Sequence, residues 1–166
     1  AHAAIIPTNW NLAEDVQDSR TTLTALAIRE LNENIYTCVE VLHPHNKMHI
    51  QRTGVNESIC LGELARNLIS SAVVSHGLSR LLADILTFNQ GSEIYRVPLP
   101  GPLAGRSFRW LLCELNQRHG QLLLSVERDG EMKTNPQGEL LLAGGDWLFI
   151  LAEGFPHELD SLVTTT

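Results

Sequence analysis

The segment IYTCVEVL (residues 35–42) decides the fold of the first half of the chain. It is apolar on both faces and rich in β-branched side chains, which is typical of an inner strand of a parallel sheet, because such a strand is buried from both sides. A similar segment, AAIIP, begins at residue 3, and a shorter one, ESICL, follows at residues 57–61. The sequence therefore predicts three strands in this region.

Helices are predicted between these strands, which gives the β-α-β-α-β order of a parallel sheet with crossover helices. SRTTLTALAIREL, behind a cap at Asp18 or Ser19, predicts a helix of about 14 residues. Pro44 is expected to open a second, short helix that runs through Arg52 and closes at Gly54. The first helix has an apolar face formed by Leu23, Leu26, Ala27 and Leu31.

Two more helices are predicted by the segments 62–74 (GELARNLISSAVV) and 78–88 (LSRLLADILTF), separated by a break at His76 and Gly77. Both have apolar residues at helical spacing, so the region is predicted to be a helix-turn-helix hairpin. The apolar stripes either pack on the chain's own sheet or form a subunit interface. The second stripe consists of Leu78, Leu81, Leu82, Ile85 and Leu86.

The pattern changes after a boundary near residues 88–92, where a second, α+β lobe is predicted. EIYRVPLPGPLAG begins with an alternating strand and SFRWLLCEL predicts a short helix. QLLLSVERDGEMK predicts a hairpin, because Asp129-Gly130 is the preferred dipeptide of a type I′ turn. GELLLAGGDWLFILAE (residues 138–153) predicts a second hairpin. Its Asp146 is expected to accept backbone N–H bonds in the turn rather than act in catalysis, since no nucleophile motif accompanies it.

Composition excludes several classes of function. The net charge of −7 with only Lys47 and Lys133 as lysines argues against a nucleic-acid partner, which requires a basic surface. No apolar run reaches the roughly 20 residues of a membrane-spanning helix. Cys38, Cys60 and Cys113 are far apart in apolar surroundings, which indicates reduced core thiols in a cytosolic protein.

The segments EIYRVPLPGPLAGRSFRWLL (93–112) and SVERDGEMKTNPQGELLLAGGDWLFILAE (125–153), together with the helix hairpin before them, resemble the RCK domain, the regulator of potassium conductance. RCK domains occur in potassium channels and in Trk-type potassium uptake systems. The resemblance implies an α/β fold: a partial Rossmann-like parallel sheet, a helix-turn-helix crossover and a small Trk-type C-terminal lobe. It divides the chain into residues 1–61 (half of the Rossmann-like lobe), 62–91 (dimerising crossover), 92–154 (C-terminal lobe) and 155–166 (tail).

Only the second half of the family's Rossmann-like lobe is present, and a strand already at residue 3 leads us to expect a piece of a longer protein. The family's nucleotide site needs a glycine-rich turn after the first strand. No GxGxxG motif occurs in the sequence, and AGG at 143–145 precedes a strand rather than a helix. We therefore expect that this chain alone requires no cofactor and binds no dinucleotide, and leave open a nucleotide in the intact protein.

A divalent cation such as calcium is the other ligand class that the resemblance implies. Glu40 matches one liganding position of the family, whereas Pro7 and Leu42 stand at neighbouring liganding positions and offer no side-chain oxygen. Three carboxylates in the loop after the first strand are expected near the same sheet edge, and hard cations prefer such oxygens. The alternative is a solvated acidic loop that caps a helix. The loop carboxylates are Glu14, Asp15 and Asp18.

HPHNKMH (residues 43–49) suggests a second, transition-metal site. His45 and His49 have i,i+4 spacing and so share one face of a helix, with His43 close by. Such a pair can bind zinc if a third ligand comes from elsewhere, although histidines near a helix start are common on surfaces.

The leading interpretation is a regulatory, non-enzymatic, ligand-sensing domain of a potassium channel, cytoplasmic and held at the inner face of the membrane by the full-length protein. It would dimerise through residues 62–87 and assemble into a ring that acts on a membrane pore domain of the same protein. One alternative is a domain or subunit of a Trk-type potassium transporter or a cation antiporter. Another is a small nucleotide- or metal-dependent hydrolase or reductase built on the same α/β half.

Overall fold

The computed structural model describes residues 2–87, 91–137, 139–157 and 159. The chain divides into two compact units, residues 1–79 and 80–166, and each unit has its own hydrophobic core. The boundary predicted near residues 88–92 lies partly outside the described residues, as does most of the tail predicted for 155–166.

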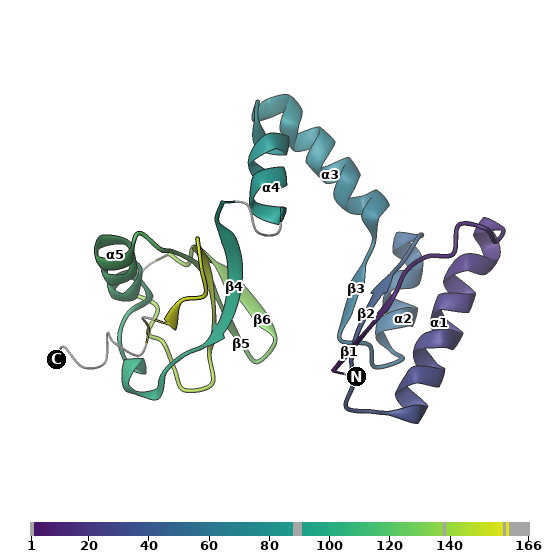
Figure 1. The fold of residues 1–166 in the computed structure, drawn as a ribbon, viewed down its shortest axis with the longest axis horizontal. Helices are drawn as coiled ribbons and strands as arrows, with labels where there is room; N and C mark the ends of the chain where they lie inside the picture. Colours follow the sequence, from purple (N-terminus) through teal and green to yellow (C-terminus); the bar gives the residue numbers. More distant parts are fainter. Residues whose placement is uncertain (1, 88–90, 138, 158, 160–166) are drawn as a thin grey trace. The chain divides into compact units, whose positions relative to one another are not determined.

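The first unit contains a three-stranded parallel sheet with the strand order β1-β2-β3 (Figure 1). The predicted β-α-β-α-β order is confirmed, and the central strand is the segment on which the prediction rested. The elements are β1 (Ala3–Ile6), α1 (Glu14–Leu31), β2 (Tyr36–Glu40), the 3₁₀ helix η1 (Pro44–Asn46), α2 (Lys47–Gln51), β3 (Glu57–Ile59) and α3 (Leu61–Val74).

Helices α1 and α2 lie on the same face of this sheet (Figure 1). Both connections run in the same direction across adjacent parallel strands, and right-handed crossovers then place both helices on one side. The covered face holds Ile6, Val39 and Val41, all of which are buried. The opposite face is largely bare, because Ile5 is 81% exposed and Tyr36 is 45% exposed. Helices α1 and α2 therefore cover one face of this sheet, and the apolar side chains of the other face remain exposed.

Helix α1 corrects the prediction made for it. It begins four residues before the expected cap, at Glu14, and its N-cap is Ala13, so that Asp18 lies inside the helix. The face that packs on the sheet includes Gln17, Asp18, Thr21 and Ala25, all buried. The apolar face expected from the sequence points to solvent, and small or polar side chains lie against the strands instead. Its exposed residues include Val16, Leu23, Leu26 and Leu31, hereafter the α1 stripe.

The second unit is built on a four-stranded antiparallel sheet with the order β4-β7-β5-β6. The predicted hairpin is confirmed, because Asp129 and Gly130 connect β5 to β6 with φ values of 53° and 79°, as a type I′ turn requires. Helix α4 begins just before the unit boundary. The elements are α4 (Leu78–Leu86), β4 (Glu93–Pro98), the 3₁₀ helix η2 (Gly101–Leu103), α5 (Phe108–His119), β5 (Leu122–Arg128), β6 (Glu131–Thr134) and β7 (Trp147–Ala152).

Helix α5 forms because its ends are capped and its spacing supplies an apolar face. Ser107 accepts a hydrogen bond from the Trp110 N–H at the N-terminus, and Gly120 takes the left-handed conformation, φ 65°, at the C-terminus. Leu111 and Leu115 are fully buried. They pack with the inner face of the sheet in a core that also contains Leu123, Val126, Leu148 and Ile150.

The second hairpin predicted for residues 138–153 is wrong in its first half. Among the described residues of this range, 139–153, only those of β7 form a strand, and it pairs with β4 and β5. Residues 139–146, hereafter the strap, run beside the start of α5 instead: the Phe108 N–H donates to the Leu140 carbonyl, 2.8 Å, and Leu141 forms a single bridge with Ser107. The place beside β7 is already taken by strands on both sides, so the strap pairs with the segment that precedes α5.

No described helix combines the length and the apolar character that crossing a lipid bilayer demands.

Candidate functional site

Asp18 is the centre of a polar cluster at the carboxyl edge of the first sheet. One carboxylate oxygen accepts the Leu42 N–H at 2.8 Å, and the other accepts the His43 N–H at 3.0 Å and the Asn46 amide at 2.8 Å. Burial alone would raise the pKa of Asp18, but the hydrogen bonds from Asn46, Leu42 and His43 outweigh it, and the pKa is lowered. Asp18 therefore fastens the loop after β2 to α1 as a carboxylate.

Glu40 lies at the end of β2, where its carboxylate accepts the Thr8 N–H at 2.8 Å. Two buried side-chain oxygens, the Thr8 hydroxyl after β1 and the Gln17 carbonyl in α1, have no hydrogen-bond partner among the described residues. Buried polar atoms are normally satisfied, so these two oxygens remain available as acceptors, and the Glu40 carboxylate is a third acceptor near the end of β2. The side chains of Glu14 and Asp15 lie outside the described part of the structure.

The histidines occupy two short helical segments rather than one continuous helix. His45 belongs to η1 and His49 to α2, while the rings of His43 and His45 stack with their centroids 5.3 Å apart. Within the described residues, no three His, Cys, Asp or Glu side chains come together as a group that could hold a metal ion. The three histidines are therefore not part of such a group, and the acidic segment stays a prediction, because the side chains of Glu14 and Asp15 are not among those described.

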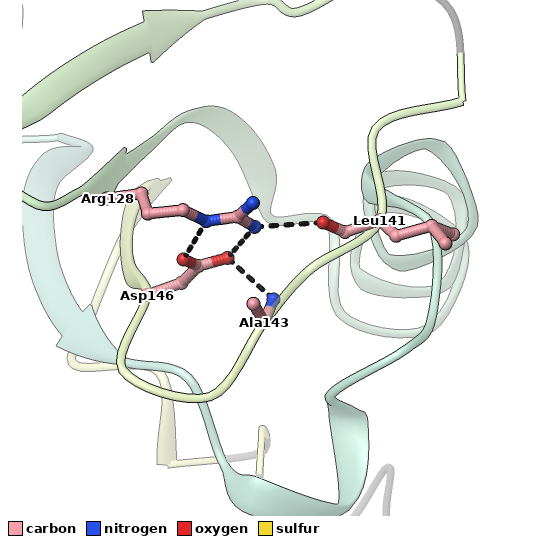
Figure 2. Close-up of polar contacts among 4 residues, drawn as sticks. All are labelled: Arg128, Leu141, Ala143 and Asp146. Carbon is pink, nitrogen blue, oxygen red and sulfur yellow. Dashed lines mark hydrogen bonds and ion pairs between the residues drawn. The ribbon is translucent and has the colours of Figure 1, made fainter.

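Arg128 and Asp146 form an ion pair in the second unit, hereafter the clamp (Figure 2). The guanidinium of Arg128 donates to both carboxylate oxygens of Asp146 at 2.7 Å and to the Leu141 carbonyl at 2.9 Å. Asp146 also accepts the Ala143 N–H at 2.8 Å. The clamp thus joins the end of β5 to both ends of the turn before β7.

The predicted role of Asp146 as an acceptor of backbone N–H bonds is confirmed, and the sequence missed its main partner. The Asp146 side chain is 0% exposed, whereas that of Arg128 is 34% exposed. The hydrogen bond from Arg128 lowers the pKa of Asp146 more than burial raises it, and the same bond raises the pKa of Arg128. The only signal in the sequence was an arginine at a strand end beside the predicted turn.

The stripe predicted as a dimer interface lies on α4. Leu81 is 56% exposed and Leu86 is 78% exposed, while Leu78, Leu82 and Ile85 are half-buried. None of the described residues of α3 and α4 is buried.

No protein-family model matches the sequence. The chain is 26% identical over 145 residues to the calcium-gated potassium channel TvoK of Thermoplasma volcanium, an alignment that covers 87% of this chain and 41% of the channel. In structure it matches the human SLO3 gating ring with a TM-score of 0.77 and 20% identity, over 93% of this chain and 33% of the other. The chain thus spans well under half the length of both relatives.

The sequence alone already indicated a resemblance to RCK domains of potassium channels, and both relatives are parts of channels or gating rings. The similarity to TvoK extends through both units, and the likeness to the gating ring covers nearly every element described above. The predicted mixture of a parallel Rossmann-like sheet and a small α+β lobe agrees with the two sheets observed. The resemblance to RCK domains is confirmed, and this chain carries the fold of an RCK domain.

Proposed function

We propose that this chain is the regulatory part of a potassium channel, in which it contributes to a cytoplasmic gating ring at the inner face of the membrane. The sequence relationship to TvoK and the shared fold with the SLO3 gating ring support this function. Their names describe a calcium-gated channel and a gating ring, and this chain matches 41% of the first and 33% of the second.

The observation that carries the proposal is the exposure of apolar surface in the first unit and on α4. The α1 stripe, the bare sheet face around Ile5 and the α4 stripe leave large apolar side chains in solvent. Isolated exposed leucines are normal, but contiguous stripes mark surfaces that meet another protein surface. A homo-oligomer buries such stripes against copies of themselves, most simply around a two-fold axis.

Ligand binding would then shift the population between two ring conformations, and the ring would transmit the shift to the pore. A ligand can move such an equilibrium only by binding one conformation more tightly than the other. The relationship to a calcium-gated channel and the fold shared with a gating ring are the reasons to propose a regulatory role rather than an enzymatic one.

Association of the purified chain tests the proposal. Light scattering over a concentration series should show a dimer or a larger species, and Leu82→Asp or Ile85→Asp should shift dissociation to concentrations at least tenfold higher, because a buried charge is costly. Arg80→Asp, on the same helix but outside the stripe, is the matched control. A chain that stays monomeric at high micromolar concentration, or charged variants with unchanged mass, would contradict the assembly.

Calcium is the ligand proposed for this assembly, at the carboxyl edge of the first sheet. The calcium gating of TvoK, the carboxylate of Glu40 and the unsatisfied oxygens of Thr8 and Gln17 support it. In calorimetry, Glu40→Gln should weaken calcium binding. Asp18 already accepts three hydrogen bonds, so Asp18→Asn should weaken binding by loosening the edge. Unchanged binding in both variants would remove these residues from the site.

A further inference from the structure

A polar hollow of about 390 Å³ lies in the second unit, where the C-terminus of α5 meets the ends of three strands. Ser92 precedes β4, Gln121 precedes β5 and Glu153 follows β7. These strands are neighbours in the order β4-β7-β5 and are paired antiparallel, so the three ends meet at one edge of the sheet. The volume is within the range of about 300–1,000 Å³ that is typical of small-molecule sites.

The last residue of α5 brings a buried nitrogen to this hollow. His119 is half-buried, and its Nε2 atom is buried with no hydrogen-bond partner among the described residues. Buried polar atoms are normally paired, so this nitrogen is open to a partner from outside the chain. In a neutral imidazole with the proton on Nδ1, the Nε2 atom is an acceptor. The site therefore offers an acceptor to a ligand that carries N–H or O–H groups.

The charges around the hollow favour a cation. Among the described residues that line it, Glu153 supplies a carboxylate, and none is a lysine or an arginine. The C-terminus of α5 adds the negative end of the helix dipole. Arg118, next to His119 on α5, is already paired with Glu114, 2.7 Å away on the same helix. A positively charged ligand is therefore attracted to this end of the unit.

An aromatic side chain in the lining favours an organic cation over a metal ion. Phe155 lines the hollow and is 51% exposed, and its ring is held edge-on to that of Tyr95, with centroids 5.7 Å apart. The face of such a ring attracts ammonium groups, whereas hard metal ions require several oxygen ligands. No group of three His, Cys, Asp or Glu that could hold a metal ion occurs in the described part of the chain.

We propose that this hollow binds a small primary ammonium cation. The ammonium group would pair with the Glu153 carboxylate and donate a second hydrogen bond to Nε2 of His119. The Ser92 hydroxyl is a further acceptor in the same lining, and the ring of Phe155 would stabilise the cation from another side. The proposal is independent of the proposed gating function, and the calcium edge belongs to the other unit.

An NMR titration of the full chain with n-butylammonium tests the proposal at about pH 8, where imidazoles are generally neutral and primary amines are protonated. We expect saturable shifts of the Gly120 and Gln121 amide signals and of the His119 ring, with no shift of the His49 ring in the first unit. Neutral n-butanol should bind at least tenfold more weakly, because it lacks the charge. If n-butylammonium causes no saturable shift, or if n-butanol, sodium or calcium ions cause the same shifts, the proposal is wrong.

Variants separate binding from folding. Glu153→Gln changes an exposed side chain and should raise the dissociation constant of n-butylammonium about tenfold, since a charge-assisted hydrogen bond is lost. Glu131→Gln, at an exposed position at the start of β6, is the matched control and should bind as the unmodified chain does. Phe155→Leu should weaken binding about threefold. Thermal melting checks that each variant is folded. Unchanged binding in Glu153→Gln would show that the cation does not bind where proposed.

Discussion

The two units differ in how completely each buries its own apolar side chains. In the second unit, α5 covers one face of the antiparallel sheet, and the core includes several side chains with no exposure, Leu111, Leu115, Leu148 and Ile150 among them. In the first unit the core is smaller, and Ile5, Leu31 and Val74 are each more than 80% exposed. The second unit buries most of its large apolar side chains, whereas the first leaves many of them exposed, as is typical of a surface that contacts other protein.

Replacing a leucine by alanine should therefore lower the free energy of unfolding much more in the second unit than in the first. Leu148→Ala should lower the free energy of unfolding of the second unit by about 3 kcal/mol, because it leaves a cavity beside fully packed neighbours. Leu64→Ala, on α3 in the first unit, should change it by less than about 0.5 kcal/mol because Leu64 is 56% exposed. Urea titration followed by tryptophan fluorescence measures both. Equal costs would mean that α3 is packed as tightly as the core.

The clamp should give the next largest effect. Asp146→Asn should cost about 2 kcal/mol, since it removes the charged bond to Arg128, and Arg128 is exposed enough to be partly solvated in the variant. Asp129→Asn, in the exposed turn next to Arg128, is the matched control and should have little effect. An unchanged unfolding midpoint in Asp146→Asn would show that the strap is held by its backbone bonds alone.

The clamp also makes the second unit sensitive to acid. The pKa of Asp146 is lower in the folded chain than in the unfolded chain, where it is about 3.9. The resulting stability is present above the unfolded value and is lost as the pH falls through the folded value. Urea midpoints between pH 7 and pH 2 should therefore fall for the unmodified chain below about pH 4, and fall less steeply for Asp146→Asn.

In the first unit, loss of the Asp18 carboxylate should destabilise the fold less than loss of Asp146 does, and its effect should be confined to the loop after β2. Asp18→Asn replaces one acceptor oxygen by a donor, so we expect a loss of about 1 kcal/mol and faster hydrogen exchange at the Leu42 and His43 amides, which it holds. Ser19→Ala, the exposed neighbour, should leave both exchange rates unchanged. Because the pKa of Asp18 is also lowered on folding, the protection should disappear on acidification, in the same direction as for Asp146. Exchange that is equal in all three chains would contradict the role given to Asp18.

Much of the fold could be predicted because the local signals agreed with it. The apolar segment at 35–42, the Asp129-Gly130 turn and the alternation after residue 92 each depend on neighbours in the sequence. The face of α1 could not be predicted in this way, since periodicity shows that a helix is amphipathic but not which partner its apolar side meets. In this helix the apolar side is exposed to solvent, and the polar side packs on the sheet.

The candidate sites were predicted less well, for a related reason. The bond between Asp146 and Ala143 is local and was foreseen, whereas the bonds to Arg128 and Leu141 depend on the strap leaving the predicted hairpin. The position of Asp18 beside Asn46, 28 residues later, depends on how α1 packs on the sheet. Spacing identified the residue types that could bind a cation, but not the hydrogen bonds that already occupy Asp18.

The α1 stripe should give the smallest effect on folding and so provides the sharpest test of the comparison. Leu23→Ala should change the free energy of unfolding measured at low concentration by less than about 0.5 kcal/mol, since Leu23 is 67% exposed. Ile28→Ala, five residues later on the side that packs against the core, is the matched truncation and should cost about 1–2 kcal/mol. Light scattering should then show the opposite order, with weaker association for Leu23→Ala than for Ile28→Ala. If Leu23→Ala destabilises the chain at low concentration as much as Ile28→Ala does, the stripe is part of the chain's own core, and the first unit is as self-sufficient as the second.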